Sequence, residues 1–246
     1  MDKIKLTQVV NAGLLIERND TKILIDGIHN EKMPEWSTVD KALMDYIIYG
    51  KDKFKDIDYL LFTHRHGDHF NLEKTLEYIK NNKVKKLVAA KINNTYINSD
   101  KLEELNTDYY EVYIINSSDI IIRCIKTKHL SHEKFGIEHY VFIININNKN
   151  ILYLGDADYT KPELINVLKS FDIDVIVAPF IITASTPGRN FVKKIAPELL
   201  ILNHLPCKED DEYNYRNMAE KSIAQHSDEM PETIIFQDLY DELIID

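Results

Sequence analysis

The feature that most constrains this chain is a short apolar run that ends in a dense group of potential metal ligands. Residues 58–63 are mostly apolar and predict a buried strand. They lead directly into three histidines and an aspartate within six residues: His64, His66, Asp68 and His69. Open α/β sheets bind ligands at the carboxyl ends of their strands, so we expect these side chains to lie at such a site. Residues 63–70 are called the ligand loop below.

The spacing within the ligand loop suggests two pairs of ligands. Side chains of an extended chain alternate between faces, so His64 and His66 are expected to point the same way. Gly67 permits a sharp turn that brings Asp68 and His69 to a neighbouring position. The loop then offers two imidazoles to one metal, and a carboxylate with an imidazole to a second. A polar loop with incidental histidines is the alternative, but this density of ligand types favours the metal site.

Composition places the chain among ordinary globular proteins and limits its partners. Its 246 residues, 44% of them hydrophobic and 28% charged, are enough for a substantial core. A formal net charge of −10 argues against a broad basic surface for nucleic acid, although a local patch stays open. The two cysteines, Cys124 and Cys207, imply no disulfide framework and fit a reducing compartment. No signal peptide and no apolar segment of about 18 residues is recognised, so we expect a cytoplasmic protein without membrane contact.

Apolar periodicity predicts an alternation of strands and helices. Strands are predicted over residues 4–10, 12–17, 21–26, 58–63, 84–89, 109–116, 120–126, 140–145, 151–156, 174–178, 198–203 and 233–237. Helices are predicted over residues 39–48, 72–79, 100–105, 160–171, 191–195 and 211–226, the fourth opening on a capping box at Thr160. The order hairpin, helix, strand occurs twice, which suggests an internal duplication within one domain, because no Gly/Ser/Pro-rich linker separates the halves.

Three further ligand candidates each follow an apolar run. His129 follows residues 120–126, Asp156 follows residues 151–155, and His204 follows residues 199–203. A single such residue is usually structural. Their shared position at predicted strand ends makes them candidates to complete the site.

The pattern His-x-His-x-Asp-His, followed by isolated His, Asp and His at strand ends, resembles the metallo-β-lactamase superfamily. The resemblance extends from residues 14–26 to His204. It implies a single domain over residues 1–246 with an α/β (α+β) fold, a four-layer αβ/βα sandwich. It implies the following ligands: His64, His66 and His129 for one metal, Asp68, His69 and His204 for the other, with Asp156 bridging. Asp26 matches the family's early aspartate, which supports the ligand loop; a turn residue at a strand end is the alternative.

This set of nitrogen and oxygen donors suits zinc, and also manganese or iron. Two divalent transition metal ions would share a bridging hydroxide as the nucleophile. Asp68 and Asp156 are expected to ligate these ions, so we assign them a catalytic role as well. Tyr159 resembles a tyrosine of acyl-homoserine lactonases that hydrogen-bonds the substrate oxygen, with apolar packing as the alternative. His132, three residues after His129, is a candidate partner of a metal ligand or a candidate proton donor, or else a loop histidine in solvent.

The short single-domain layout resembles the branch that contains ascorbate-phosphate lactonases. We therefore expect hydrolysis of an ester, lactone or phosphodiester of a small molecule, with homo-oligomers left open. The first alternative is a phosphodiesterase or nuclease acting on RNA, DNA or a cyclic nucleotide. A mononuclear iron enzyme similar to persulfide dioxygenases and a non-catalytic family member are further alternatives. His66 stands where flavodiiron proteins carry glutamate, which argues against oxygen reduction.

Overall fold

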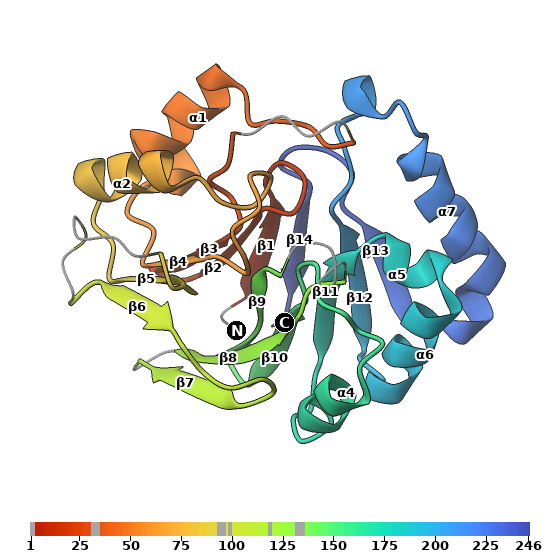
Figure 1. The fold of residues 1–246 in the computed structure, drawn as a ribbon. Helices are drawn as coiled ribbons and strands as arrows, with labels where there is room; N and C mark the ends of the chain where they lie inside the picture. Colours follow the sequence, from red (N-terminus) through yellow and green to blue (C-terminus); the bar gives the residue numbers. More distant parts are fainter. Residues whose placement is uncertain (1–2, 31–34, 93–96, 98–99, 118–119, 131–135) are drawn as a thin grey trace. The chain divides into compact units, whose positions relative to one another are not determined.

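The computed structural model describes residues 3–30, 35–92, 97, 100–117, 120–130 and 136–246. The chain divides into two compact units: unit 1 comprises residues 1–106 and 238–246, and unit 2 comprises residues 107–237. Each unit contains one seven-stranded mixed sheet with helices packed on it (Figure 1).

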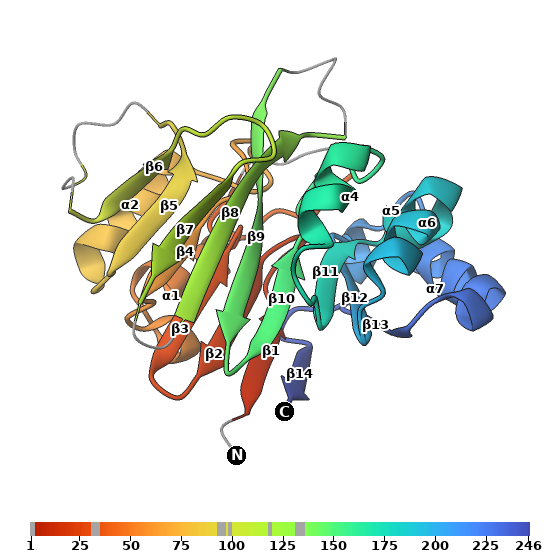
Figure 2. The same cartoon turned by 90° about the horizontal axis from the view of Figure 1, so that it is seen from below.

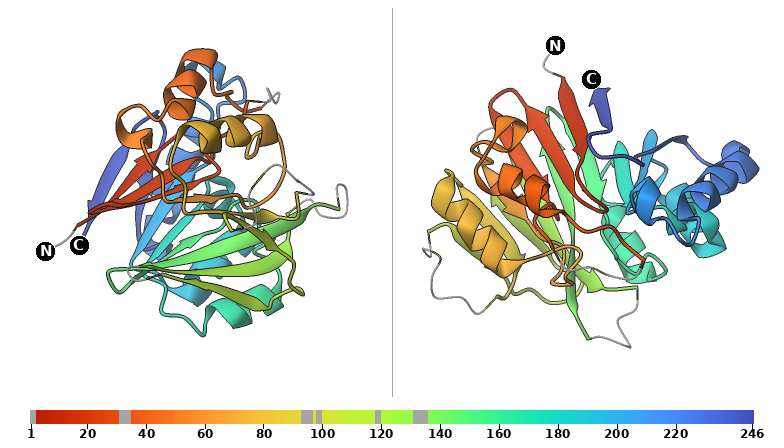
Figure 3. Two further views of the ribbon diagram at one scale, coloured as in Figure 1. Left: turned by 90° about the vertical axis from the view of Figure 1, so that its left-hand side faces the viewer. Right: turned by 90° about the horizontal axis from the view of Figure 1, so that it is seen from above.

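The sheet of unit 1 has the strand order β14-β1-β2-β3-β4-β5-β6. Its strands are β1 (Ile4–Gln8), β2 (Leu14–Arg18), β3 (Thr21–Ile25), β4 (Tyr59–Leu61), β5 (Lys86–Ala90), β6 (Leu102–Leu105) and β14 (Glu242–Ile245). Helices α1 (Lys41–Ile48) and α2 (Leu72–Asn81) lie together on one face of this sheet (Figure 3), and a short 3-10 turn covers Asp52–Phe54. The strands from β14 to β3 run antiparallel to their neighbours, and those from β3 to β6 run parallel.

The ends of α1 and α2 follow from the sequence. The Asp40 side chain accepts a hydrogen bond from the Leu43 amide at 2.7 Å, and Asn71 accepts one from the Lys74 amide at 2.9 Å. Gly50 follows α1 with a φ of +57°, the left-handed conformation that ends many helices. Gly50 therefore lies just past the end of α1, and Asn71 caps the start of α2. These helices cover a core of buried apolar side chains from β2 to β5.

Tyr78 of α2 fixes the loop between α1 and β4 through its hydroxyl group. The side chain is fully buried; its hydroxyl donates to the Phe54 carbonyl at 2.7 Å and accepts from the Ile57 amide at 3.0 Å. Burial raises the pKa of this hydroxyl above its ordinary value, so it stays protonated and able to donate.

Replacing Tyr78 with phenylalanine should therefore lower the free energy of unfolding by about 2 kcal/mol, because two buried backbone groups lose their partner. Urea denaturation followed by circular dichroism measures the change. Tyr49→Phe is the matched control, since the Tyr49 side chain is 57% exposed. Equal urea midpoints of unfolding for the two variants would contradict the structural role of the Tyr78 hydroxyl.

The sheet of unit 2 has the strand order β13-β12-β11-β10-β9-β8-β7 (Figure 2). Its strands are β7 (Val112–Asn116), β8 (Ile120–Lys128), β9 (Glu138–Ile146), β10 (Lys149–Tyr153), β11 (Val175–Pro179), β12 (Leu199–Asn203) and β13 (Glu232–Ile235). Its helices are α4 (Pro162–Leu168), α5 (Ile181–Ala184), α6 (Thr186–Ile195) and α7 (Tyr215–His226), with 3-10 turns at Lys208–Asp210 and Ser227–Glu229.

The two sheets repeat one topology. In unit 2 the strands from β7 to β10 are antiparallel to their neighbours and those from β10 to β13 are parallel, as in unit 1. The segment β9-β10-α4-β11 therefore matches β2-β3-α1-β4 in order and in strand direction. The predicted repeat of hairpin, helix and strand is confirmed.

The predicted α/β (α+β) class is confirmed, because each unit is a mixed sheet flanked by helices. One element was assigned wrongly. Residues 100–105 were predicted as a helix, but 102–105 form β6, which pairs with β5, and the Glu104 carboxylate accepts a hydrogen bond from the Ile92 amide. Such pairing overrides a weak helical pattern in a segment this short.

Smaller differences concern helix ends. Thr160 is not the N-cap of α4: its hydroxyl donates to the Asp158 carboxylate, and Lys161 holds the cap position. Helix α6 starts earlier than predicted because the Ser185 hydroxyl accepts from the Gly188 amide at 3.1 Å. Strand β14 and the short helix α5 were not predicted.

Among the described residues, no helix has the length and hydropathy needed to cross a membrane.

Candidate metal centre

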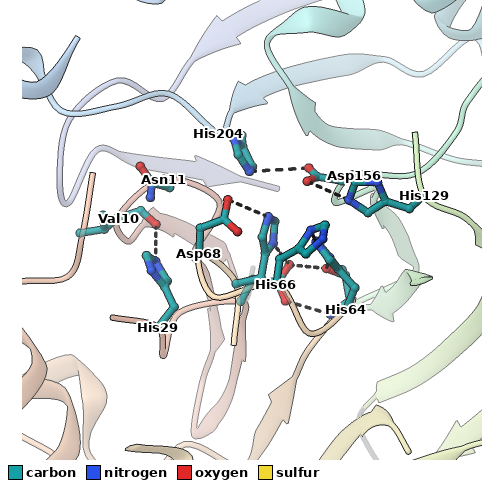
Figure 4. A network of polar contacts seen from close by, with 12 residues as sticks. Val10, Asn11, His29, His64, His66, Asp68, His129, Asp156 and His204 are labelled. Carbon is teal, nitrogen blue, oxygen red and sulfur yellow. Dashed lines mark hydrogen bonds and ion pairs between the residues drawn. The ribbon is translucent and has the colours of Figure 1, made fainter. Parts of the chain in front are cut away.

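In unit 1 the ligand loop leaves the carboxyl end of β4 and folds back in a tight turn. The amides of His69 and Phe70 both donate to the His66 carbonyl, at 3.0 and 2.9 Å. The loop pairs its side chains as the spacing predicts. The His64 Nε2 and His66 Nδ1 atoms are 2.8 Å apart (Figure 4), and His69 Nε2 is 3.8 Å from Asp68 Oδ2. The turn forms without a left-handed φ at Gly67. We call His64, His66, Asp68 and His69 the loop half-site.

Asp26, one residue beyond β3, holds the ligand loop in place. Its side chain is fully buried. One carboxylate oxygen accepts from the Thr63 amide at 2.8 Å; the other accepts from the Thr63 hydroxyl at 2.6 Å and lies 2.9 Å from His69 Nδ1. An ionised carboxylate can only accept, so His69 donates from Nδ1 and leaves Nε2 free of a proton. These contacts agree with the predicted support of the loop by Asp26.

Thr63 orients the first histidine in the same way. Its hydroxyl gives its proton to Asp26, so it can only accept from His64 Nδ1, which lies 3.0 Å away. His64 and His69 are thus both held through Nδ1 with Nε2 directed elsewhere, the arrangement usual for metal-binding histidines. The role of Thr63 was missed, although its position between the strand and the first histidine was a usable signal.

In unit 2 the three isolated candidates stand at the carboxyl ends of alternate strands. His129 follows β8, Asp156 follows β10 and His204 follows β12. Strand β9 is antiparallel to both β8 and β10, while β12 runs parallel to β10 through β11, so all three ends lie at one edge of the sheet. An isolated bridge between His129 and Ala157 brings the first two ends together.

Asp156 presents one carboxylate oxygen to each of these histidines. Its Oδ2 lies 3.4 Å from His129 Nε2, and its Oδ1 lies 3.6 Å from His204 Nε2 (Figure 4). Gly155 and His204 both have left-handed φ values, +48° and +57°, which turn the chain sharply at these strand ends. We call His129, Asp156 and His204 the strand-end half-site.

Two further candidates were Tyr159, as a hydrogen-bond donor to substrate, and His132, as a proton donor, and both stay predictions. The Tyr159 hydroxyl lies 3.1 Å from the Ser185 hydroxyl at the start of α6, and the ring packs near Phe191. Burial raises the pKa of Tyr159, so its hydroxyl stays protonated at neutral pH. Its contact with substrate stays a prediction. His132 lies outside the described residues.

Comparison with known proteins identifies the family. A model of the Beta-lactamase superfamily domain matches residues 5–204. No curated protein sequence matches the chain significantly.

Solved structures share the fold at low sequence identity. Igni18, a metallo hydrolase from the archaeon Ignicoccus hospitalis, is 16% identical with a TM-score of 0.68, and the match covers 99% of both chains. An isothiocyanate hydrolase from Delia radicum gut bacteria is 13% identical with a TM-score of 0.65, covering 97% of this chain and 98% of that one. CmlA, a diiron β-hydroxylase from Streptomyces venezuelae, is 14% identical with a TM-score of 0.65. The match covers 100% of this chain and 55% of CmlA.

The present chain therefore spans about half the length of CmlA. The family match extends over most of the chain and includes both half-sites. The chain belongs to the metallo-β-lactamase superfamily.

Proposed function

We propose that this chain is a metal-dependent hydrolase in which the loop half-site and the strand-end half-site together form one dinuclear centre. Residues 1–246 would then be a single functional domain. The observation that carries this proposal is the Asp156 carboxylate, which directs a different oxygen toward each of two imidazole nitrogens. A carboxylate held in this way is suited to bridging two ions.

The chemistry of the donors fits divalent transition metals. Imidazole nitrogens and carboxylate oxygens suit zinc, manganese and iron, and neither half-site contains a thiolate. One ion would be held by His64, His66 and His129, the other by Asp68, His69 and His204, with Asp156 shared between them. The fixed Nδ1 hydrogen bonds of His64 and His69 support this assignment, because they leave each Nε2 without a proton, the state in which an imidazole nitrogen ligates a metal.

The protein's own groups would prepare the site for hydrolysis. When bound, two divalent ions supply Lewis acidity and a water-derived nucleophile near neutral pH. The buried Asp26 carboxylate orients His69 and increases its basicity, and the Thr63 hydroxyl orients His64. Tyr159 stays protonated and is proposed to donate a hydrogen bond to a substrate oxygen. His132 is proposed as a proton donor.

We propose a small-molecule ester, lactone or phosphodiester as the substrate and the cytoplasm as the location. The net charge of −10 supports a small molecule over a nucleic-acid polymer. In such folds, the loops that follow the strands select the leaving group within a class of substrates.

Elemental analysis with a substrate panel tests the proposal. Protein purified without chelator should contain about two equivalents of zinc, manganese or iron. The panel comprises lactones, carboxylate esters, thioesters, bis-p-nitrophenyl phosphate and short RNA, and we expect turnover of at least one small ester, lactone or phosphodiester. Turnover of RNA alone, or oxidation of a persulfide by an iron-loaded protein, would replace the proposed reaction. A protein that binds no metal would exclude the proposed centre itself.

A further inference from the structure

Unit 2 has a second candidate site at the helices α5 and α7, which lie side by side (Figure 1). A cavity of about 460 Å³ opens there, within the size range of small-molecule sites. Its walls come from α7, the residues that precede it, and the last residue of α5: Ala184, Tyr213, Asn214, Asn217, Met218, Lys221, Ser222, Gln225 and His226. None of them belongs to either half-site.

Ser222 indicates that the cavity is adapted to a polar ligand. The residue is 6% exposed, and its hydroxyl has no hydrogen-bond partner among the described residues. A buried hydroxyl without a partner is unfavourable for folding, since it has given up its hydration without compensation. A ligand that hydrogen-bonds Ser222 would supply the missing interaction.

Three longer polar side chains line the cavity along one stripe of α7. Asn217, Lys221 and Gln225 are spaced four residues apart, so they follow one another over about 12 Å of helix. Within the described part of the chain, their side chains make neither a hydrogen bond nor an ion pair. They offer two amides and one ammonium group to a bound molecule.

The apolar part of the cavity suits a flat ring. Tyr213 is 52% exposed, and its ring stacks on Tyr215 with a centroid distance of 5.5 Å and an interplanar angle of 18°. Stacking on Tyr215 holds one face of Tyr213 and leaves the other for a ligand. Met218 beside it is 44% exposed and adds a polarisable surface.

The charge of the cavity favours an anion. It is lined by Lys221 and His226 but by no carboxylate, although the whole chain carries a net charge of −10. Glu229, which does not line the cavity, lies 3.9 Å from His226. Lys221 therefore remains as a cation to which an anionic group can bind.

We propose that this cavity binds a nucleoside monophosphate. The base stacks on Tyr213 and forms hydrogen bonds with Asn217 and the Ser222 hydroxyl, and the phosphate binds Lys221. Aromatic stacking is a general means of holding nucleobases, and amide side chains match their hydrogen-bonding edges. This binding site is independent of the proposed metal centre.

Thermal shift and calorimetry with AMP, adenosine and ribose 5-phosphate test the proposal. AMP should raise the Tm and bind more tightly than either fragment, because only AMP carries both the base and the phosphate. Binding of AMP should weaken as salt is raised, since the Lys221 contact is exposed and screened. Equal binding of AMP and ribose 5-phosphate, or no binding of AMP, would overturn the proposal.

Variants assign the binding to this cavity. Tyr213→Ala and Lys221→Met should each lower the affinity for AMP at least tenfold. Their controls are Tyr49→Ala and Lys169→Met, which alter equally exposed residues away from the cavity and should leave AMP binding unchanged. Asp156→Ala should also retain AMP binding; loss of binding in that variant alone would assign the nucleotide to the metal centre instead.

Ser222→Ala separates a ligand contact from a structural role. Removing an unpartnered hydroxyl should raise the Tm of the ligand-free protein and reduce the further rise caused by AMP. A lower ligand-free Tm with an undiminished response to AMP would contradict the role of Ser222. If AMP fails to bind and Tyr213→Ala instead dissociates an oligomer in light scattering, the cavity is part of an interface between copies of the chain.

Discussion

Replacing Asp156 with asparagine should remove one metal equivalent and lower the hydrolytic rate by about three orders of magnitude, or about 4 kcal/mol in activation free energy. The amide has nearly the same shape, but it carries no charge and offers one oxygen instead of two. It therefore cannot serve both ions as the carboxylate is proposed to do. Elemental analysis and kcat on the best substrate of the panel measure the two effects.

Asp158→Asn is the matched control, two residues further along the same turn. The Asp158 carboxylate accepts from the Thr160 hydroxyl and lies 3.0 Å from Lys161 Nζ, so it shapes the start of α4. This variant should keep both metals and most of its activity. If Asp156→Asn behaves like Asp158→Asn, Asp156 does not bridge two ions and the dinuclear proposal is wrong.

Replacing Asp26 with asparagine should weaken metal binding by about 10–100-fold without removing any proposed ligand. The carboxylate accepts from Thr63 twice and from His69 once, and an amide cannot accept all three hydrogen bonds. His69 then loses its fixed tautomer, and the loop loses about 2 kcal/mol of stabilisation. Chelator competition gives the metal affinity, and urea denaturation gives the free energy of unfolding.

Asp40→Asn is the control for this variant, because Asp40 caps α1 and asparagine caps helices almost equally well. Its metal affinity should equal that of the unaltered protein. Unchanged metal affinity in Asp26→Asn would limit Asp26 to a turn residue that supports only the fold.

The ligand loop was recognisable in the sequence because its chemistry is local. Four potential ligands within six residues restrict the interpretation far more than a single histidine does. His129, Asp156 and His204 were recognisable as a group because each follows an apolar run. Such runs mark buried strands, and strand ends are where this kind of fold gathers its ligands.

What the sequence left open depends on long-range geometry. The hydroxyl of Tyr159 approaches Ser185, which is 26 residues away, and no local pattern reveals that direction. Similarly, residues 102–105 form a strand because they pair with β5, whereas their own sequence fits a short helix equally well. The tautomers of His64 and His69 follow from hydrogen bonds that only the folded chain forms.

Strand β14 has a consequence for how the protein is synthesised. It completes unit 1 by pairing with β1, yet Glu242 follows Phe70 by 172 positions. At translation rates of about 5–20 residues per second, the ligand loop is made roughly 9–34 seconds before the strand that closes its sheet. During that interval β1 has an open edge, which is prone to pairing with other chains. The histidines of the ligand loop are also synthesised before the residues of the strand-end half-site, so they can bind a metal first. The position of β14 at the end of the chain therefore determines whether metal can bind before the sheet of unit 1 is closed.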